Sequence, residues 1–255
     1  MKRELAYFFA ALRFFTRLPV PRWVGHDQDQ LDHAARYFPL IGILIGAIGA
    51  GITELAALAL PVGVAVLLGM AATILATGAF HEDGFADSCD GFGGGWEKAQ
   101  VLAIMKDSRV GSYAALGVGL ILLTKWNVLI ETDAAVDPPF LALALIAGHA
   151  VSRLASTVLI YFLDYVRDDA SSKSKPLAQR MAPHELAIAA IVGLAPCLLL
   201  PLANTLVALA AAALATLLAA RYFLRRIGGY TGDSLGATQQ VSELAFYLGL
   251  LCSFI

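Results

Sequence analysis

The chain has 255 residues, of which 58% are hydrophobic and only 15% charged, and its formal net charge is −2. A soluble domain carries about 25% charged residues, and a single soluble core of this length could not bury so much apolar surface. The composition excludes an ordinary soluble enzyme, and the near-neutral charge excludes a basic surface for nucleic acid. We therefore predict an all-α, polytopic membrane protein.

The N-terminal segment 5–15 is apolar but short, and it contains Arg13. We expect it to form an interfacial or partly buried helix rather than a membrane span. It does not resemble a cleavable signal peptide, because Arg13 and Arg17 interrupt the apolar run and no Ala-x-Ala pattern follows.

Seven stretches are long and apolar enough to cross a membrane as helices. They are residues 38–60, 62–80, 112–130, 140–163, 186–200, 202–220 and 237–255. Pro61 separates the first two stretches, and Pro201 separates the fifth and sixth. No long soluble insert interrupts them, so residues 1–255 are predicted to form one membrane-embedded domain.

The basic residues are distributed asymmetrically around these spans. Of the 18 Lys and Arg residues, 16 precede the first span or lie in the loops after spans two, four and six. The loop after span three carries Glu131, Asp133 and Asp137 instead. Because Lys and Arg are concentrated in cytoplasmic loops, this pattern predicts a cytoplasmic N-terminus.

An acidic segment follows the second predicted span and reads T-G-A-F-H-E-D-G-F-A-D-S-C-D-G-F-G-G-G-W. Asp83, Asp87 and Asp90 stand at positions i, i+4 and i+7, so a helix would place them on one face. Such like charges repel, and hard cations such as Mg²⁺ or Mn²⁺ would compensate them. Asp83 and Asp90 would lie about 10 Å apart along the helix, which suggests two ions with Asp87 between them. The alternative is a solvated acidic loop.

Glycines in this segment favour a phosphate ligand. Gly84 and Gly91 would leave the helix surface bare beside the acids, and glycines 93–95 should end the helix. Mg²⁺ bound by few carboxylates usually also binds substrate phosphates. We therefore expect the ligand to be a phosphate or pyrophosphate.

The following segment, residues 104–111, reads I-M-K-D-S-R-V-G. Asp107 could complete the metal site, and Lys106 and Arg109 could pair with phosphate oxygens. The alternative is a plain basic pair at the membrane surface.

A third polar segment precedes the last span and reads R-R-I-G-G-Y-T-G-D-S-L-G-A-T-Q-Q-V-S-E. Thr231 and Asp233 are candidates for the phosphate site, although Thr231 could equally cap the helix that follows. Glu243 lies inside a predicted span, where a buried acid is a functional candidate by default.

Other candidates are single charged or titratable side chains. Arg153 lies in the fourth span, four residues after His149, and should face a wet cavity or an acid there. Arg17 lies beside two prolines and could reach a phosphate or anchor to anionic lipid. His81 stands two residues before Asp83 and could orient the site, accept a proton, or be structural.

Six motifs, in chain order, resemble those of the cobalamin synthase family, the adenosylcobinamide-GDP ribazoletransferases. They are F-x-T-R-L-P-V-P at 14–21, F-P-L-I-G at 38–42, H-x-D-G-x-A-D-x-x-D-G at 81–91, I-M-x-D-S-R-x-G at 104–111, V-S-R at 151–153 and G-G-x-T-G-D-x-L-G-A at 228–237. The resemblance runs from about residue 14 to 249. One departure is Gln240, where the family carries an acid.

The resemblance implies a Mg²⁺-dependent phosphotransferase in the cytoplasmic (inner) membrane of a prokaryote, with its active site facing the cytoplasm. Its substrates would be adenosylcobinamide-GDP and α-ribazole or its 5′-phosphate, and its products adenosylcobalamin or its 5′-phosphate and GMP. The implied catalytic residues are Asp87, His81 and Asp90. The implied metal ligands are Asp83, Asp87, Asp90 and Asp107. The implied phosphate-binding residues are Arg17, Lys106, Arg109, Arg153, Thr231 and Asp233.

Two alternatives differ in class. The acidic helix also looks like the metal motif of CDP-alcohol phosphotransferases, but the rest of that motif is not matched after Ala86. An ion-coupled transporter could use Arg153, Lys125 and Glu54 along a pathway. Transporter sites lie near the membrane midplane, whereas most acids here lie at the cytoplasmic side, which favours an enzyme. The chain could also form a homo-oligomer.

Overall fold

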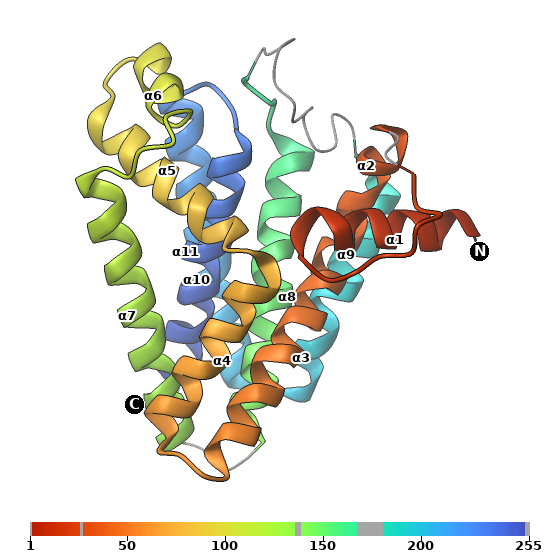
Figure 1. Cartoon of the computed structure of the whole chain (residues 1–255), viewed down its shortest axis with the longest axis vertical. Helices are drawn as coiled ribbons and strands as arrows, with labels where there is room; N and C mark the ends of the chain where they lie inside the picture. Colours follow the sequence, from red (N-terminus) through yellow and green to blue (C-terminus); the bar gives the residue numbers. More distant parts are fainter. Residues whose placement is uncertain (1, 26–27, 136–138, 168–180, 253–255) are drawn as a thin grey trace.

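The computed structural model describes residues 2–25, 28–135, 139–167 and 181–252, and its regular elements are all helices (Figure 1). This confirms the predicted all-α class. The elements are α1 (Lys2–Phe15), α2 (Gln28–Ala34), η1 (Ala35–Tyr37), α3 (Phe38–Ala57), α4 (Val62–Thr77), α5 (Phe80–Gly94), α6 (Lys98–Ile104), α7 (Ser112–Ala135), α8 (Phe140–Phe162), α9 (Pro183–Leu194), η2 (Ala195–Leu199), α10 (Leu202–Arg226) and α11 (Gly232–Cys252).

Helix α8 lies at the centre of the bundle. It contacts α3, α9, α10 and α11, and most of its side chains are buried. Helices α3, α4, α7, α8, α10 and α11 run roughly along the long axis of the molecule (Figure 1). α1 instead lies across that axis, beside α2 and α3.

Glycines allow α3 to approach α8 closely. A Cβ atom on Gly42 would lie 2.3 Å from the carbonyl oxygen of His149, and one on Gly46 would lie 2.7 Å from the Cα of Ile146. These Cβ atoms would clash with backbone atoms of α8, which cannot rotate away as a side chain can. The closeness of these two helices therefore depends on residues without side chains, as it commonly does between membrane helices.

Length and composition single out four unbroken helices that could cross a membrane: 30–57, Ser112–Ala134, Phe140–Phe162 and Leu202–Arg226. A fifth arises if α4 and α5 are counted together. The predicted count of seven spans is not confirmed, although each of the seven stretches is mostly helical where described. The fifth stretch is a shorter apolar helix that ends in the 3-10 turn η2, and α11 carries Asp233 and Glu243.

The second predicted span ends earlier than expected. α4 stops at Thr77, and the next two residues, Gly78 and Ala79, both have positive φ, of 68° and 60°. The chain turns by 88° there, so α5 leaves the direction of α4. A hydropathy pattern cannot reveal this turn because residues 78–80 are themselves apolar or small.

We predict that Gly42→Ala destabilises the protein by about 1–3 kcal/mol, because its methyl group would meet the α8 backbone. Gly51→Ala is the matched control on the same helix, since nothing lies within 4 Å of the position that its methyl group would occupy. Thermal unfolding of the two purified variants in detergent measures the difference. Equal stability of both variants would contradict the close approach of α3 to α8.

Candidate functional site

Helix α5 carries the acidic motif, which is helical as predicted. His81, Gly84, Ser88 and Gly91 are buried on its inner face. Asp83 is exposed, and Asp87 and Asp90 are partly exposed. The helix ends at Gly94, within the predicted glycine run.

The glycines of α5 serve contacts between helices rather than an open surface for phosphate. A Cβ on Gly84 would lie 3.0 Å from the carbonyl oxygen of Asp233, and one on Gly236 would lie 3.2 Å from the Cα of Gly84. Gly91 faces Met105 in the same way. The expectation that Gly84 and Gly91 leave the helix surface bare is therefore wrong, and the contacts of Gly84 instead bring α5 against α11.

This contact places Asp233, in the first turn of α11, near the acids of α5. Burial, followed by the negative charges of Asp233, Asp83 and Asp90, raises the pKa of Asp87 to about 7. Asp233 thus lies near Asp83 and Asp87, and its predicted phosphate-binding role stays a prediction. We call these three residues the acidic cluster.

The acidic cluster fits a divalent cation by its chemistry. Its donors are carboxylate oxygens, which hard ions such as Mg²⁺ prefer. Burial is the largest cause of the raised pKa of Asp87, and the neighbouring carboxylates Asp233 and Asp83 add to it. Within the described ranges, no group of three or more His, Cys, Asp or Glu side chains is already gathered closely enough to surround an ion. The carboxylates would therefore have to move together around a bound cation.

Arg167 belongs to the site although its sequence context did not indicate this. Its Nη2 atom lies 2.5 Å from Oδ2 of Asp233, and its charge lowers the pKa of Asp87. In the sequence it is one of several basic residues in a loop, and nothing local distinguishes it. Only the fold places it beside α11.

The side chain of Asp90, a residue of α5, reaches the N-terminus of α7. Its two carboxylate oxygens accept hydrogen bonds from the backbone N–H groups of Gly111 (2.6 Å) and Ala114 (2.9 Å). Backbone N–H groups at a helix start have no partner within the helix, and a carboxylate there also complements the helix dipole. Asp90 therefore connects α5 to α7.

Asp107 and Arg109 form an exposed pair with each other. The Nε of Arg109 donates to both oxygens of Asp107 at 3.0 Å, and this guanidinium lowers the pKa of Asp107 to about 2. Neither residue is among the charges that shift the pKa of Asp87. Lys106 is exposed beside them. The structure thus brings these three predicted residues together, but not into the acidic cluster.

Three other candidates lie at contacts between or at the ends of helices, two of them through their side chains. The hydroxyl of Thr231 accepts a hydrogen bond from the Ser234 N–H (3.1 Å), and so caps α11 as one interpretation expected. The backbone N–H of Arg17 donates to the carbonyl of Ala76 (2.8 Å) beside the turn between α4 and α5, and the residue itself is exposed. His81 is buried and its ring stacks on Phe15, with 5.5 Å between ring centroids.

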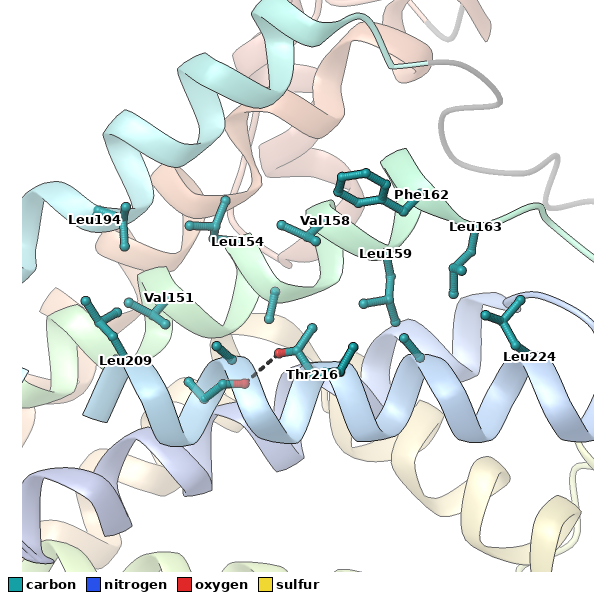
Figure 2. A pocket seen from close by; sticks show the side chains of 15 residues that line it. Val151, Leu154, Val158, Leu159, Phe162, Leu163, Leu194, Leu209, Thr216 and Leu224 are labelled. Carbon is teal, nitrogen blue, oxygen red and sulfur yellow. Dashed lines mark hydrogen bonds between the residues drawn. The ribbon is translucent and has the colours of Figure 1, made fainter. Parts of the chain in front are cut away.

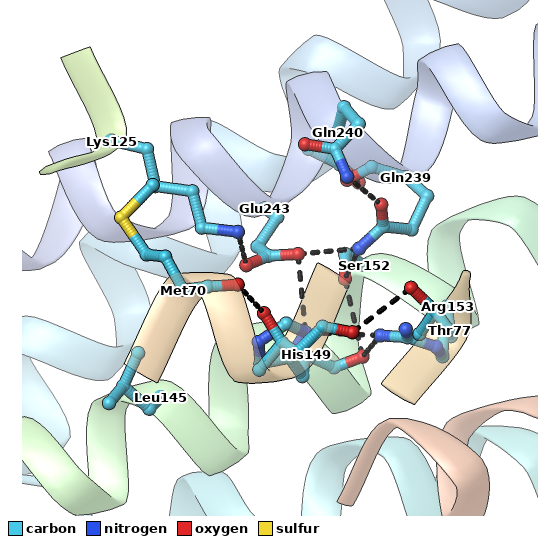
Figure 3. Close-up of polar contacts among 12 residues, drawn as sticks. Met70, Thr77, Lys125, Leu145, His149, Ser152, Arg153, Gln239, Gln240 and Glu243 are labelled. Atoms are coloured by element: carbon cyan, nitrogen blue, oxygen red, sulfur yellow. Dashed lines mark hydrogen bonds and ion pairs between the residues drawn. The ribbon is translucent and has the colours of Figure 1, made fainter. Parts of the chain in front are cut away.

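A second polar group is buried inside the bundle (Figure 3). Glu243 of α11 is fully buried, pairs with Lys125 of α7, and accepts hydrogen bonds from Gln239 and from Tyr247 (3.1 Å). The Nδ1 of His149 lies 3.4 Å from the same carboxylate. The buried acid is thus paired, as its position in an apolar bundle requires.

Arg153 belongs to this buried group and not to the acidic cluster. It is 2% exposed, and its Nη1 donates to the carbonyl oxygen of His149 at 3.0 Å. Gln240 lies at the edge of the group, where its Nε2 donates to Glu82 (3.0 Å) and to Gln239 (2.9 Å). An amide at position 240 can donate both hydrogen bonds, which an ionised acid cannot.

An apolar pocket of about 640 Å³ lies between α8 and α10 (Figure 2). Aliphatic side chains such as Leu154, Val158 and Leu217 line it, and the hydroxyl of Thr216 donates to the Ala212 carbonyl (2.7 Å). Among the described residues, no charged side chain lines this pocket. Its lining has no group that could perform phosphate chemistry.

Comparisons with known proteins agree with the motif pattern. The sequence model of the family described as Cobalamin-5-phosphate synthase matches residues 7–251. A protein of Shewanella frigidimarina named adenosylcobinamide-GDP ribazoletransferase is 50% identical over 98% of this chain and 95% of its own length. A protein of Shewanella halifaxensis with the same name is 47% identical over 98% of this chain and 96% of its own. No solved structure matches the chain.

The buried ion pair yields a prediction about stability. Glu243→Gln leaves the Lys125 charge without its counter-charge, at a cost of about 3–5 kcal/mol. The double variant Lys125→Met with Glu243→Gln should recover part of this loss, because the unpaired charge of Lys125 is gone. Unfolding of the purified variants in detergent measures both. A double variant less stable than Glu243→Gln alone would contradict the pairing.

Proposed function

The chain belongs to the family of cobalamin-5-phosphate synthases, and we propose that it is a magnesium-dependent transferase that joins adenosylcobinamide-GDP to α-ribazole or its 5′-phosphate and releases GMP. We further propose that it acts in the inner membrane with the acidic cluster facing the cytoplasm. The observation that carries this proposal is the match of the family model to residues 7–251. Asp83 and Asp87 of α5 and Asp233 of α11, with Arg167 paired to Asp233, support the proposed cation site.

The reaction needs charge neutralisation and positioning more than any reactive side chain. A hydroxyl of the ribazole attacks the phosphorus that carries the cobinamide arm, and the bond from this phosphorus to GMP breaks. The hydroxyl proton passes to a carboxylate at the site. Mg²⁺, when bound by Asp83, Asp87 and Asp233, would neutralise the diphosphate charge.

The basic residues predicted to bind phosphate divide into an exposed group and a buried one. Lys106 and Arg109 are exposed on the segment after α6 and lie outside the bundle interior, so they are suited to meet a large substrate from solution. Arg153 is enclosed with His149 and Glu243, and we propose a structural role for it. The comparisons do not support the transporter alternative, because the similar Shewanella proteins are named as transferases.

We predict that Asp87→Asn reduces GMP release by about 10²-fold or more, because the variant loses the central carboxylate of the acidic cluster. Membrane insertion and thermal stability should stay near wild type, since the change is isosteric and the side chain is only partly buried. Release of GMP from adenosylcobinamide-GDP and α-ribazole measures the effect. Glu131→Gln, exposed near the far end of α7, is the control. Near-normal activity of Asp87→Asn would overturn the assignment.

We also predict a requirement for a divalent cation. Chelation by EDTA should abolish GMP release, and added Mg²⁺ should restore it, because carboxylate oxygens favour hard ions. Titration of Mg²⁺ into the chelated, purified enzyme checks this. Full activity in excess EDTA would remove the cation from the proposal and leave the acidic cluster without its assigned role.

A further inference from the structure

Arg167 is held beside the acidic cluster by backbone contacts. The segment before it forms a parallel bridge to Tyr230, in which the Val166 N–H donates to the Tyr230 carbonyl (3.0 Å) and the Tyr230 N–H donates to the Asp164 carbonyl (2.9 Å). Gly229 permits this bridge, because a Cβ there would lie 2.1 Å from the Asp164 carbonyl oxygen. The bridge sets Arg167 opposite the start of α11.

The guanidinium of Arg167 compensates part of the negative charge of the acidic cluster. The ion pair with Asp233 is largely shielded from solvent, since the two side chains are 16% and 19% exposed. One guanidinium stands against three carboxylates, so the group remains negative. A divalent cation at the same carboxylates would supply the missing charge, and it would repel the guanidinium next to it.

The guanidinium also has unused capacity to donate. Its Nε atom is buried and has no hydrogen-bond partner among the described residues. A buried donor without a partner is costly, and Arg presents its N–H groups in a planar fork that matches phosphate oxygens. Since the ion pair to Asp233 uses Nη2, the Nε edge is left for a ligand.

We propose that Arg167 changes partner during the reaction: it holds Asp233 while the site is empty, and it binds a phosphate oxygen of the nucleotide-activated substrate once a divalent cation occupies the carboxylates. This inference rests on the proposed function for the identity of the substrate. It assigns to Arg167 two opposite effects, competition with the cation and attraction of the diphosphate.

Because the two effects are opposite, removing the Arg167 side chain should raise the affinity for the cation and lower the affinity for the nucleotide. In Arg167→Met, Mn²⁺ alone should bind about 3–10-fold more tightly than to wild type, because a competing positive charge is gone. GDP, measured in the presence of saturating Mn²⁺, should bind about 10–100-fold more weakly, because a charge-assisted hydrogen bond is lost. Electron paramagnetic resonance of Mn²⁺ and equilibrium dialysis of GDP provide the two readouts without any turnover.

Two further variants make the result specific. Arg167→Lys keeps the charge and loses the fork, so Mn²⁺ affinity should stay near wild type while GDP affinity falls part of the way. Arg225→Met removes an exposed arginine at the end of α10, and it should change neither affinity. If Arg167→Met does not fold, the fall in GDP affinity of Arg167→Lys still tests the phosphate contact.

Each outcome decides the proposal. Weaker or unchanged Mn²⁺ binding in Arg167→Met would refute the competition, and unchanged GDP binding would refute the phosphate contact. A merely structural role predicts that both affinities fall together. If wild-type protein binds Mn²⁺ and GDP as expected but releases no GMP from adenosylcobinamide-GDP and α-ribazole, the proposed function fails while the role of Arg167 stands.

Discussion

The close contact between α5 and α11 is the constraint on which the site depends. Gly84 and Gly236 face each other across it, and a Cβ on Gly236 would lie only 3.2 Å from the Cα of Gly84. Because neither residue has a side chain, the two backbones approach closely enough for Asp233 to act on Asp87. The turn at Gly78 and Ala79 then sets the direction in which α5 leaves α4.

The molecule keeps two groups of charged side chains in different electrostatic conditions. Inside the bundle, Glu243 is matched by Lys125 and surrounded by donors, which suits an apolar setting where an unpaired charge is costly. At the end of the bundle, the acidic cluster carries more charge than its basic partner, Arg167. Pairing stabilises the first group, and the second is where we propose that a divalent cation binds.

Much of the fold could be predicted from the sequence because it follows from local rules. Apolar stretches of sufficient length indicated the long helices, and the i, i+4, i+7 spacing of Asp83, Asp87 and Asp90 indicated an acidic helix that ends in glycines. The break after Thr77 was not predicted, because it depends on backbone angles at two small residues rather than on polarity.

The sequence by itself determined the all-α class, the acidic helix and the family, since each is carried by residue order and spacing along one segment. Only the tertiary structure decided which charges meet: Arg167 and Asp233 are 66 residues apart yet paired, while Asp90 caps α7 and Arg153 lies inside the bundle. The physical reason is that electrostatic interaction depends on distance in space. That distance is set here by contacts between segments far apart in the sequence, such as Gly84 against Gly236 and Asp164 against Tyr230, which no local pattern records.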